Sequence, residues 1–183
     1  MKRLQRDAVL LSLLENMWAH GSWCGETHLQ KATYFLQELL SVPLGFDFIL
    51  YKHGPFSFDL RDEITAMRGD FLIKYQPQRY PYGPSLVEDV GADRLKGIFS
   101  RTIHQYSNEV NFVADTLGNK GVSELERLGT ALYFIRRQHA EYEQLASLIH
   151  KLKPHISPEV AQGALQDVAE IMKMANKAKL LDQ

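Results

Sequence analysis

The chain has 183 residues, of which 45% are hydrophobic and 23% are charged, and its 21 Lys and Arg nearly balance 22 Asp and Glu. These fractions exclude a disordered chain, and a typical size of about 150 residues per domain predicts one domain over residues 1–183. A net charge of −1 excludes a globally basic nucleic-acid binder but leaves a local basic patch open. The single cysteine excludes an internal disulfide and a cysteine-based zinc site.

The first 18 residues combine a basic start with an apolar run, which imitates a signal peptide. Glu15 ends the apolar run early, and no small-x-small cleavage site follows before Trp18. The apolar residues recur at helical spacing, so we expect a core helix over residues 2–18. No window approaches the ~20 apolar residues of a spanning helix. The sequence therefore predicts a cytoplasmic protein that has no membrane partner.

In residues 25–68 the sequence predicts a helix, a short strand and a second helix. The first of these helices starts after Gly25 with Thr27 as its N-cap, and it ends before Pro43. Residues 46–51 are rich in aromatic and branched side chains, which is typical of a strand. The sequence Gly54-Pro55 then predicts a turn, and Ser57 is a suitable N-cap for a helix over 58–68.

Two strands, 71–75 and 85–90, predict a long hairpin with a proline-rich tip. Everything beyond residue 93 has helical periodicity. We expect helices over 94–117, 123–137, 142–152 and 157–180, with a capping box at Ser123 and a Ser157-Pro158 start. The predicted class is mainly α with a small β component: a winged-helix-like part (1–92, strand plus β-hairpin) packed on a helical bundle (93–183).

Catalytic signatures are missing from the sequence. The seven histidines form no H-E-x-x-H motif, and there is no Walker sequence, G-x-G-x-x-G or G-x-S-x-G. Cys24 precedes a helix, where a thiol can be activated, but a small buried residue is the favoured interpretation. We therefore expect no catalytic residue, no metal, no cofactor and no enzymatic activity.

The predicted hairpin tip is the most suggestive surface. Residues 74–82 contain two positive charges, three tyrosines and no acid. Basic residues among aromatics are typical of surfaces that contact phosphates and stack on bases. Tyrosines are equally typical of protein interfaces. In a third interpretation, the tyrosines pack on the rest of the protein. The helix over 58–68 argues against DNA, since Asp59, Asp62 and Glu63 outnumber its two arginines, unlike a recognition helix.

Four short motifs resemble those of the YwgA-like and Panacea (SocA-type antitoxin) family. The stretch 27–36 (THLQKATYFL) resembles its LQK-x-x-Y-F/L-L helix, and 51–60 (YKHGPFSFDL) its Y-G-P-[FY]-S-x-x-L turn, with His53 in place of the tyrosine. The stretch 125–134 resembles its L-E-x-L-A-T helix, and 151–157 (KLKPHIS) its K-P-x-x-S turn. The resemblance implies an antitoxin that neutralises a small toxin, an adaptor or a transcription regulator, often phage-related or associated with defence.

The first hypothesis is a non-enzymatic antitoxin or adaptor that binds and occludes a protein partner, such as a toxin. Its contacts are predicted at the turn and the hairpin: Lys52, His53, Phe56, Lys74, Tyr75, Arg79, Tyr80 and Tyr82. The alternative is a winged-helix DNA-binding regulator. It would be a homodimer that contacts phosphates through Lys74, Arg79 and the N-terminal Lys2, Arg3 and Arg6.

Overall fold

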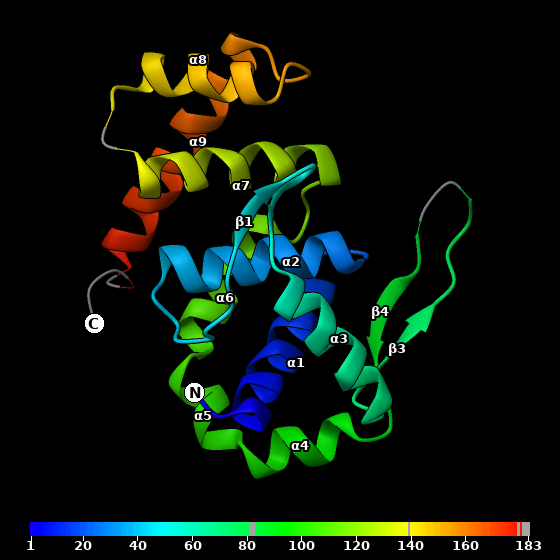
Figure 1. The fold of residues 1–183 in the computed structure, drawn as a ribbon. Helices are drawn as coiled ribbons and strands as arrows, with labels where there is room; N and C mark the ends of the chain where they lie inside the picture. The colour runs from blue at the N-terminus through cyan, green and yellow to red at the C-terminus, as the bar shows by residue number, and fades with distance from the viewer. Residues whose placement is uncertain (81–82, 139, 179, 181–183) are drawn as a thin grey trace.

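The computed structural model (Figure 1) describes residues 1–80, 83–138, 140–178 and 180. Its elements in chain order are α1 (Arg3–Ala19), α2 (Glu26–Tyr34), η1 (Phe35–Leu39), β1 (Ile49–Tyr51), β2 (Gly54–Phe56), α3 (Phe58–Gly69), β3 (Ile73–Gln76), β4 (Ser85–Glu88), α4 (Ala92–Ile98), α5 (Ser100–Gln105), α6 (Ser107–Leu117), α7 (Val122–Arg137), α8 (Tyr142–Leu152) and α9 (Pro158–Lys177). The expected class, mainly α with a small β component, is confirmed.

Helix α1 lies at the centre of the N-terminal half. Its residues 8–11, 13 and 14 are each at most 1% exposed, so apolar side chains are covered on nearly every face. The helices α2, α4, α5 and α6 pack around it. Central turns that are apolar on nearly every face are expected in a core, and the predicted core helix over 2–18 is confirmed as Arg3–Ala19.

Helix α2 begins two residues before the expected position. Its N-cap is Gly25, so the prediction of Thr27 at this position was wrong. The helix continues into a π-helical turn, η1, before Pro43. The predicted strand over 46–51 is only Ile49–Tyr51, because residues 46–48 have no strand partner in the described chain.

The four strands form two separate antiparallel hairpins. Strand β1 pairs with β2, with Tyr51 opposite Gly54, so the turn lies at Lys52-His53 and Pro55 belongs to a strand. Strand β3 pairs with β4, with Lys74 opposite Val87. A winged helix would pair its first strand with the wing, which the described strands do not do, so that detail is not confirmed. The β3–β4 hairpin projects away from the helices (Figure 1).

The expected helix over 94–117 is divided into α4, α5 and α6. The breaks fall at Phe99 and Tyr106, where the backbone leaves the helical region and the half-buried rings pack against the core. Sequence periodicity cannot detect such breaks, because core packing imposes them. Helix α7 is capped by the backbone of Gly121 instead of by Ser123, so the predicted capping box was wrong.

Two serine caps were predicted correctly. The hydroxyl of Ser57 accepts a hydrogen bond from the Leu60 amide at 3.2 Å, and that of Ser157 accepts one from Val160 at 3.4 Å. Helices α7, α8 and α9 pack together at one end of the molecule (Figure 1). The apolar stripe of α9 (Ala164, Val168, Ile171 and Ala175) is buried within the chain. Across the described residues, no helix has the length and apolar character needed to span a membrane.

Candidate functional site

Helix α2 holds the β1–β2 hairpin through two neighbouring polar side chains. The Gln30 amide donates to the Ser57 carbonyl and accepts from the Ser57 amide, each at 2.9 Å. The Lys31 ammonium donates to the Pro55 carbonyl at 2.9 Å. Gln30 and Lys31 are both buried, so these bonds form away from competing water. They fix strand β2 and the start of α3 on α2.

A buried ion pair holds the other side of the same hairpin. The Lys153 ammonium donates to the carbonyls of Tyr51 (3.0 Å) and Lys52 (2.6 Å) and pairs with Glu126 Oε1 at 3.1 Å. Glu126 also contacts His155 at 3.1 Å and His53 at 3.4 Å. Burial favours a raised pKa for Glu126, but the hydrogen bonds from Lys153 and His155 outweigh it and hold the pKa below its ordinary value.

The hairpin approaches α7 so closely that glycine is required at its tip. Gly54 has a φ of +85°, and a Cβ there would lie 3.2 Å from the Glu126 carbonyl and 3.3 Å from Thr130 Oγ1. A side chain at Gly54 would be strained by its backbone and crowded by α7. All four short motifs noted in the sequence therefore meet around one hairpin, which they hold rigidly.

Three aromatic rings from this hairpin and from α3 form a cluster, the aromatic patch. The ring centroids of Tyr51 and Phe56 are 5.6 Å apart, those of Phe56 and Phe58 5.1 Å, and those of Tyr51 and Phe58 5.8 Å. Tyr51 is 53% exposed and Phe58 41% exposed, while Phe56 is half-buried. The Arg61 guanidinium stacks over Phe58 at 5.0 Å. Rigid, exposed aromatic clusters are typical of protein-binding surfaces.

The structure places the predicted turn residues at this patch. Lys52 and His53 form the exposed hairpin turn, and Phe56 belongs to the patch itself. Tyr51 and Phe58 were not singled out from the sequence, because a strand and a helix start explained them. The spacing of three aromatics around Gly54-Pro55 is the signal that could have identified the patch.

The predicted contact residues of the β3–β4 hairpin are of two kinds: some pair within the chain, and others are exposed. Lys74 pairs with Asp89 at 3.0 Å, and the Arg68 guanidinium stacks over Tyr75 at 3.9 Å. Arg79 is exposed, and Tyr80 is 97% exposed. The remaining predicted contact, Tyr82, lies outside the described residues.

The two hairpins border adjoining hollows. A cleft of about 740 Å³ lies at the base of the β3–β4 hairpin and includes Tyr75 and Pro84. A cavity of about 300 Å³ lies beside the β1–β2 hairpin and includes His53. Glu26 and Thr27 line both, so the first turn of α2 joins the two hollows. The candidate site is thus one surface that runs from one hairpin to the other.

Arginines expected to contact DNA are used inside the molecule. Arg3 pairs with Glu63 and Asp70, each at 2.7 Å, and Arg6 pairs with Glu63 and stacks over Phe46 at 4.4 Å. Glu63 is only 8% exposed, so this acid of the helix over 58–68 faces α1 and not the solvent. These ion pairs join α1 to α3.

Cys24 is fully buried, and burial raises the pKa of its thiol to about 12. A thiol in this state is a poor nucleophile, which supports the interpretation of Cys24 as a small core residue. No three metal-ligating side chains come together in the part of the chain that the structure describes.

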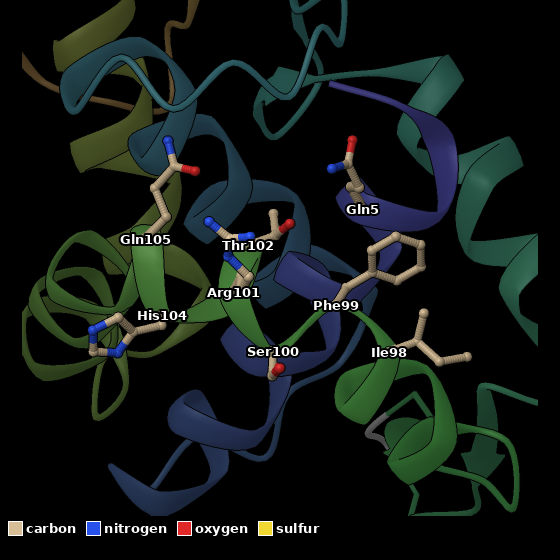
Figure 2. A pocket seen from close by; sticks show the side chains of 8 residues that line it. All are labelled: Gln5, Ile98, Phe99, Ser100, Arg101, Thr102, His104 and Gln105. Atoms are coloured by element: carbon tan, nitrogen blue, oxygen red, sulfur yellow. The ribbon is translucent and has the colours of Figure 1, made fainter.

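A further cleft, of about 810 Å³, lies between the start of α1 and the α4–α5 corner (Figure 2). It contains Gln5, Arg101 and His104, and His104 points away from the other two. None of the predicted contact residues lies there, so we place the candidate site at the hairpins.

No protein-family model matches the chain, and no curated protein matches it at a significant level. The functional argument therefore rests on the geometry of the surface.

Proposed function

We propose that the protein is a non-enzymatic interaction module, of the antitoxin or adaptor kind, that binds a protein partner and occludes its working surface. The observation that carries this proposal is the aromatic patch of Tyr51, Phe56 and Phe58, which a rigidly held hairpin and the start of α3 present together. The resemblance of four motifs to the Panacea family supports the choice of an antitoxin or adaptor within this broader class.

The patch has the physical properties of a binding hot spot. Its aromatic side chains offer a large contact area, and their mutual contacts limit the rotamer freedom that binding would otherwise remove. Lys153, Lys31 and Gln30 hold the backbone beneath them, so the surface is organised before a partner arrives. Lys52 and His53 supply polar groups at its rim.

DNA binding, the alternative function, has less support. Arg3, Arg6 and Lys74, which were candidates for phosphate contacts, each pair with a carboxylate of the chain itself. A cation that is already paired releases fewer counterions when it meets a phosphate, so it adds less to affinity.

The test is affinity capture from the native host with the full chain, with and without nuclease. We expect a stoichiometric protein partner that survives nuclease treatment. The double variant Tyr51→Ala/Phe58→Ala should lower its recovery or affinity roughly 10-fold or more, since hot-spot aromatics contribute about 2 kcal/mol each.

The matched control is Phe71→Ala/Val90→Ala, which removes two apolar side chains that are 64% and 85% exposed and lie outside both hollows. This control should retain the partner. Equal capture by both double variants would reject the aromatic patch. Recovery of DNA, with proteins lost after nuclease treatment, would favour the regulator instead.

A further inference from the structure

Lys31 is a buried cation that lacks a matching anion. Its side chain belongs to a residue that is 2% exposed, and its ammonium has one hydrogen bond, to the Pro55 carbonyl at 2.9 Å. Among the described residues, no carboxylate lies within 4 Å of it. Glu126, which attracts it over a longer distance, is already paired with Lys153 and contacts two histidines.

An unpaired buried ammonium is unfavourable, because it loses hydration without gaining a counter-charge. Burial accordingly lowers the pKa of Lys31 to about 8. Structural lysines of this kind are rare, and the nearby Lys153 shows the usual solution, with a carboxylate and two carbonyls around its ammonium. Lys31 is as buried as Lys153, but it has one backbone carbonyl where Lys153 has two carbonyls and a carboxylate.

Lys31 also lines the 300 Å³ cavity beside the hairpin. The rim of this cavity includes Tyr51 and Phe56 of the aromatic patch, together with His53. On another side, the cavity is continued by Glu26 and Thr27 towards the cleft of the β3–β4 hairpin. The Glu26 carboxyl lies beyond ion-pair distance of Lys31, and burial raises its pKa, which favours its neutral form.

We propose that this cavity binds the carboxylate of an aspartate or glutamate side chain that the partner presents next to an apolar residue. Lys31 donates a charge-assisted hydrogen bond to the carboxylate, and the adjacent apolar residue packs on the aromatic patch. An acidic side chain within a segment fits better than a chain terminus, since surfaces for a continuing chain lie on both sides of the cavity. This inference rests on the proposed function, because it assumes a protein partner.

The test is a titration of the full, isotope-labelled chain with capped peptides, followed by nuclear magnetic resonance. The probes are acetyl-Leu-Glu-Leu-amide, the same peptide with Gln or Lys in the centre, and inorganic phosphate. We expect the Glu peptide to shift the signals of residues 30–31 and 51–56 and to bind roughly 10-fold more tightly than the Gln peptide. It should also raise the pKa of Lys31, which is measured from the chemical shift of the Lys31 Cε signal. The pKa of a purely structural lysine would not change when the peptide is added.

The variant Lys31→Met should fold and should bind the Glu and Gln peptides equally. The matched control Lys173→Met removes an exposed cation of α9 that lines neither hollow, and it should keep the preference for Glu. Equal binding of the Glu and Gln peptides to the unaltered chain would overturn the proposal. So would tighter binding of phosphate, or no detectable binding of the Glu peptide at about 10 mM, a concentration well above a Kd of 1 mM.

The outcome of the affinity capture is independent of the outcome of the peptide titration. A partner that depends on Tyr51 and Phe58 but binds Lys31→Met unchanged would leave the proposed function standing and remove only the acidic contact.

Discussion

Two clusters of charged side chains, each built around a buried glutamate, organise this molecule, and they differ in what they hold. The α1–α3 cluster consists of Arg3, Arg6, Asp7, Glu63 and Asp70. The hairpin cluster consists of Lys31, His53, Glu126, Lys153 and His155. In the first, side chains pair with side chains and join two helices. In the second, cations bind backbone carbonyls of a hairpin that carries exposed aromatic rings.

The α1–α3 cluster therefore has a structural role, whereas the hairpin cluster holds the exposed aromatic patch in place. Asp7 lies at the closed end of the α1–α3 cluster, fully buried and without a hydrogen bond to its carboxyl oxygens in the described chain. Lys31 lies at the open end of the hairpin cluster and lines a cavity. Both carry unfavourable burial, and the proposed acidic ligand would relieve it at Lys31 alone. Four substitutions test this comparison.

The largest effect is expected at Asp7. Burial and the charge of Glu63 raise its pKa from 3.8 to about 7, so the folded state holds a proton that the unfolded state releases between these values. The stability of the protein should therefore rise relative to Asp7→Asn as the pH falls from 7 towards 4. The total difference is about 4 kcal/mol. Urea unfolding of both proteins across this range measures it, and parallel pH profiles would contradict the prediction.

Glu126→Gln should weaken the hairpin cluster. Lys153 would remain buried without its counter-charge, which costs about 3 kcal/mol of the free energy of unfolding. The control is Glu124→Gln, which removes the half-exposed partner of Lys120 on the same helix and should cost less than about 1 kcal/mol. Chemical denaturation at pH 7 compares the two. Equal losses would mean that the hairpin cluster is no more important than a surface pair.

Lys31→Met should have the opposite sign and stabilise the fold. The lowered pKa of about 8, compared with an ordinary 10.5, corresponds to a penalty of about 3 kcal/mol for the protonated lysine. The variant also loses the hydrogen bond to Pro55, which costs about 1 kcal/mol. The free energy of unfolding at pH 7 should therefore increase by about 2 kcal/mol.

The pH dependence of this gain provides an internal check. Below pH 8 the penalty is fully present. As the pH rises towards 10.5, Lys31 in the folded state is neutral and the stability of the unaltered protein approaches that of the variant. A variant that is less stable at pH 7 would show that Lys31 already has a sufficient partner within the chain.

The smallest effect is expected at Lys74, whose side chain is 56% exposed and pairs with Asp89. An exposed pair contributes about 0.5 kcal/mol or less, so Lys74→Ala should leave the midpoint of thermal unfolding nearly unchanged. A loss above 1 kcal/mol would indicate that the β3–β4 hairpin depends on this pair.

The sequence alone determined most of the helices and several of their ends. Apolar spacing located α1, α3, α7, α8 and α9, because helical periodicity is a local property. Ser57 and Ser157 identified two starts, since a cap bonds to an amide three residues ahead. The Gly54-Pro55 pair indicated a turn in this region but placed it two residues too late, because Gly54 and Pro55 belong to β2 and the turn lies at Lys52-His53.

The tertiary structure decided the rest. The pairing of β1 with β2, and the breaks at Phe99 and Tyr106, depend on contacts with the folded core. The residue type alone would place Lys31 and Lys153 on the surface, because lysine is rarely fully buried. Lys153 meets the Tyr51 carbonyl across 102 positions of the chain. No local pattern contains such a contact, and the candidate site is built from contacts of this kind.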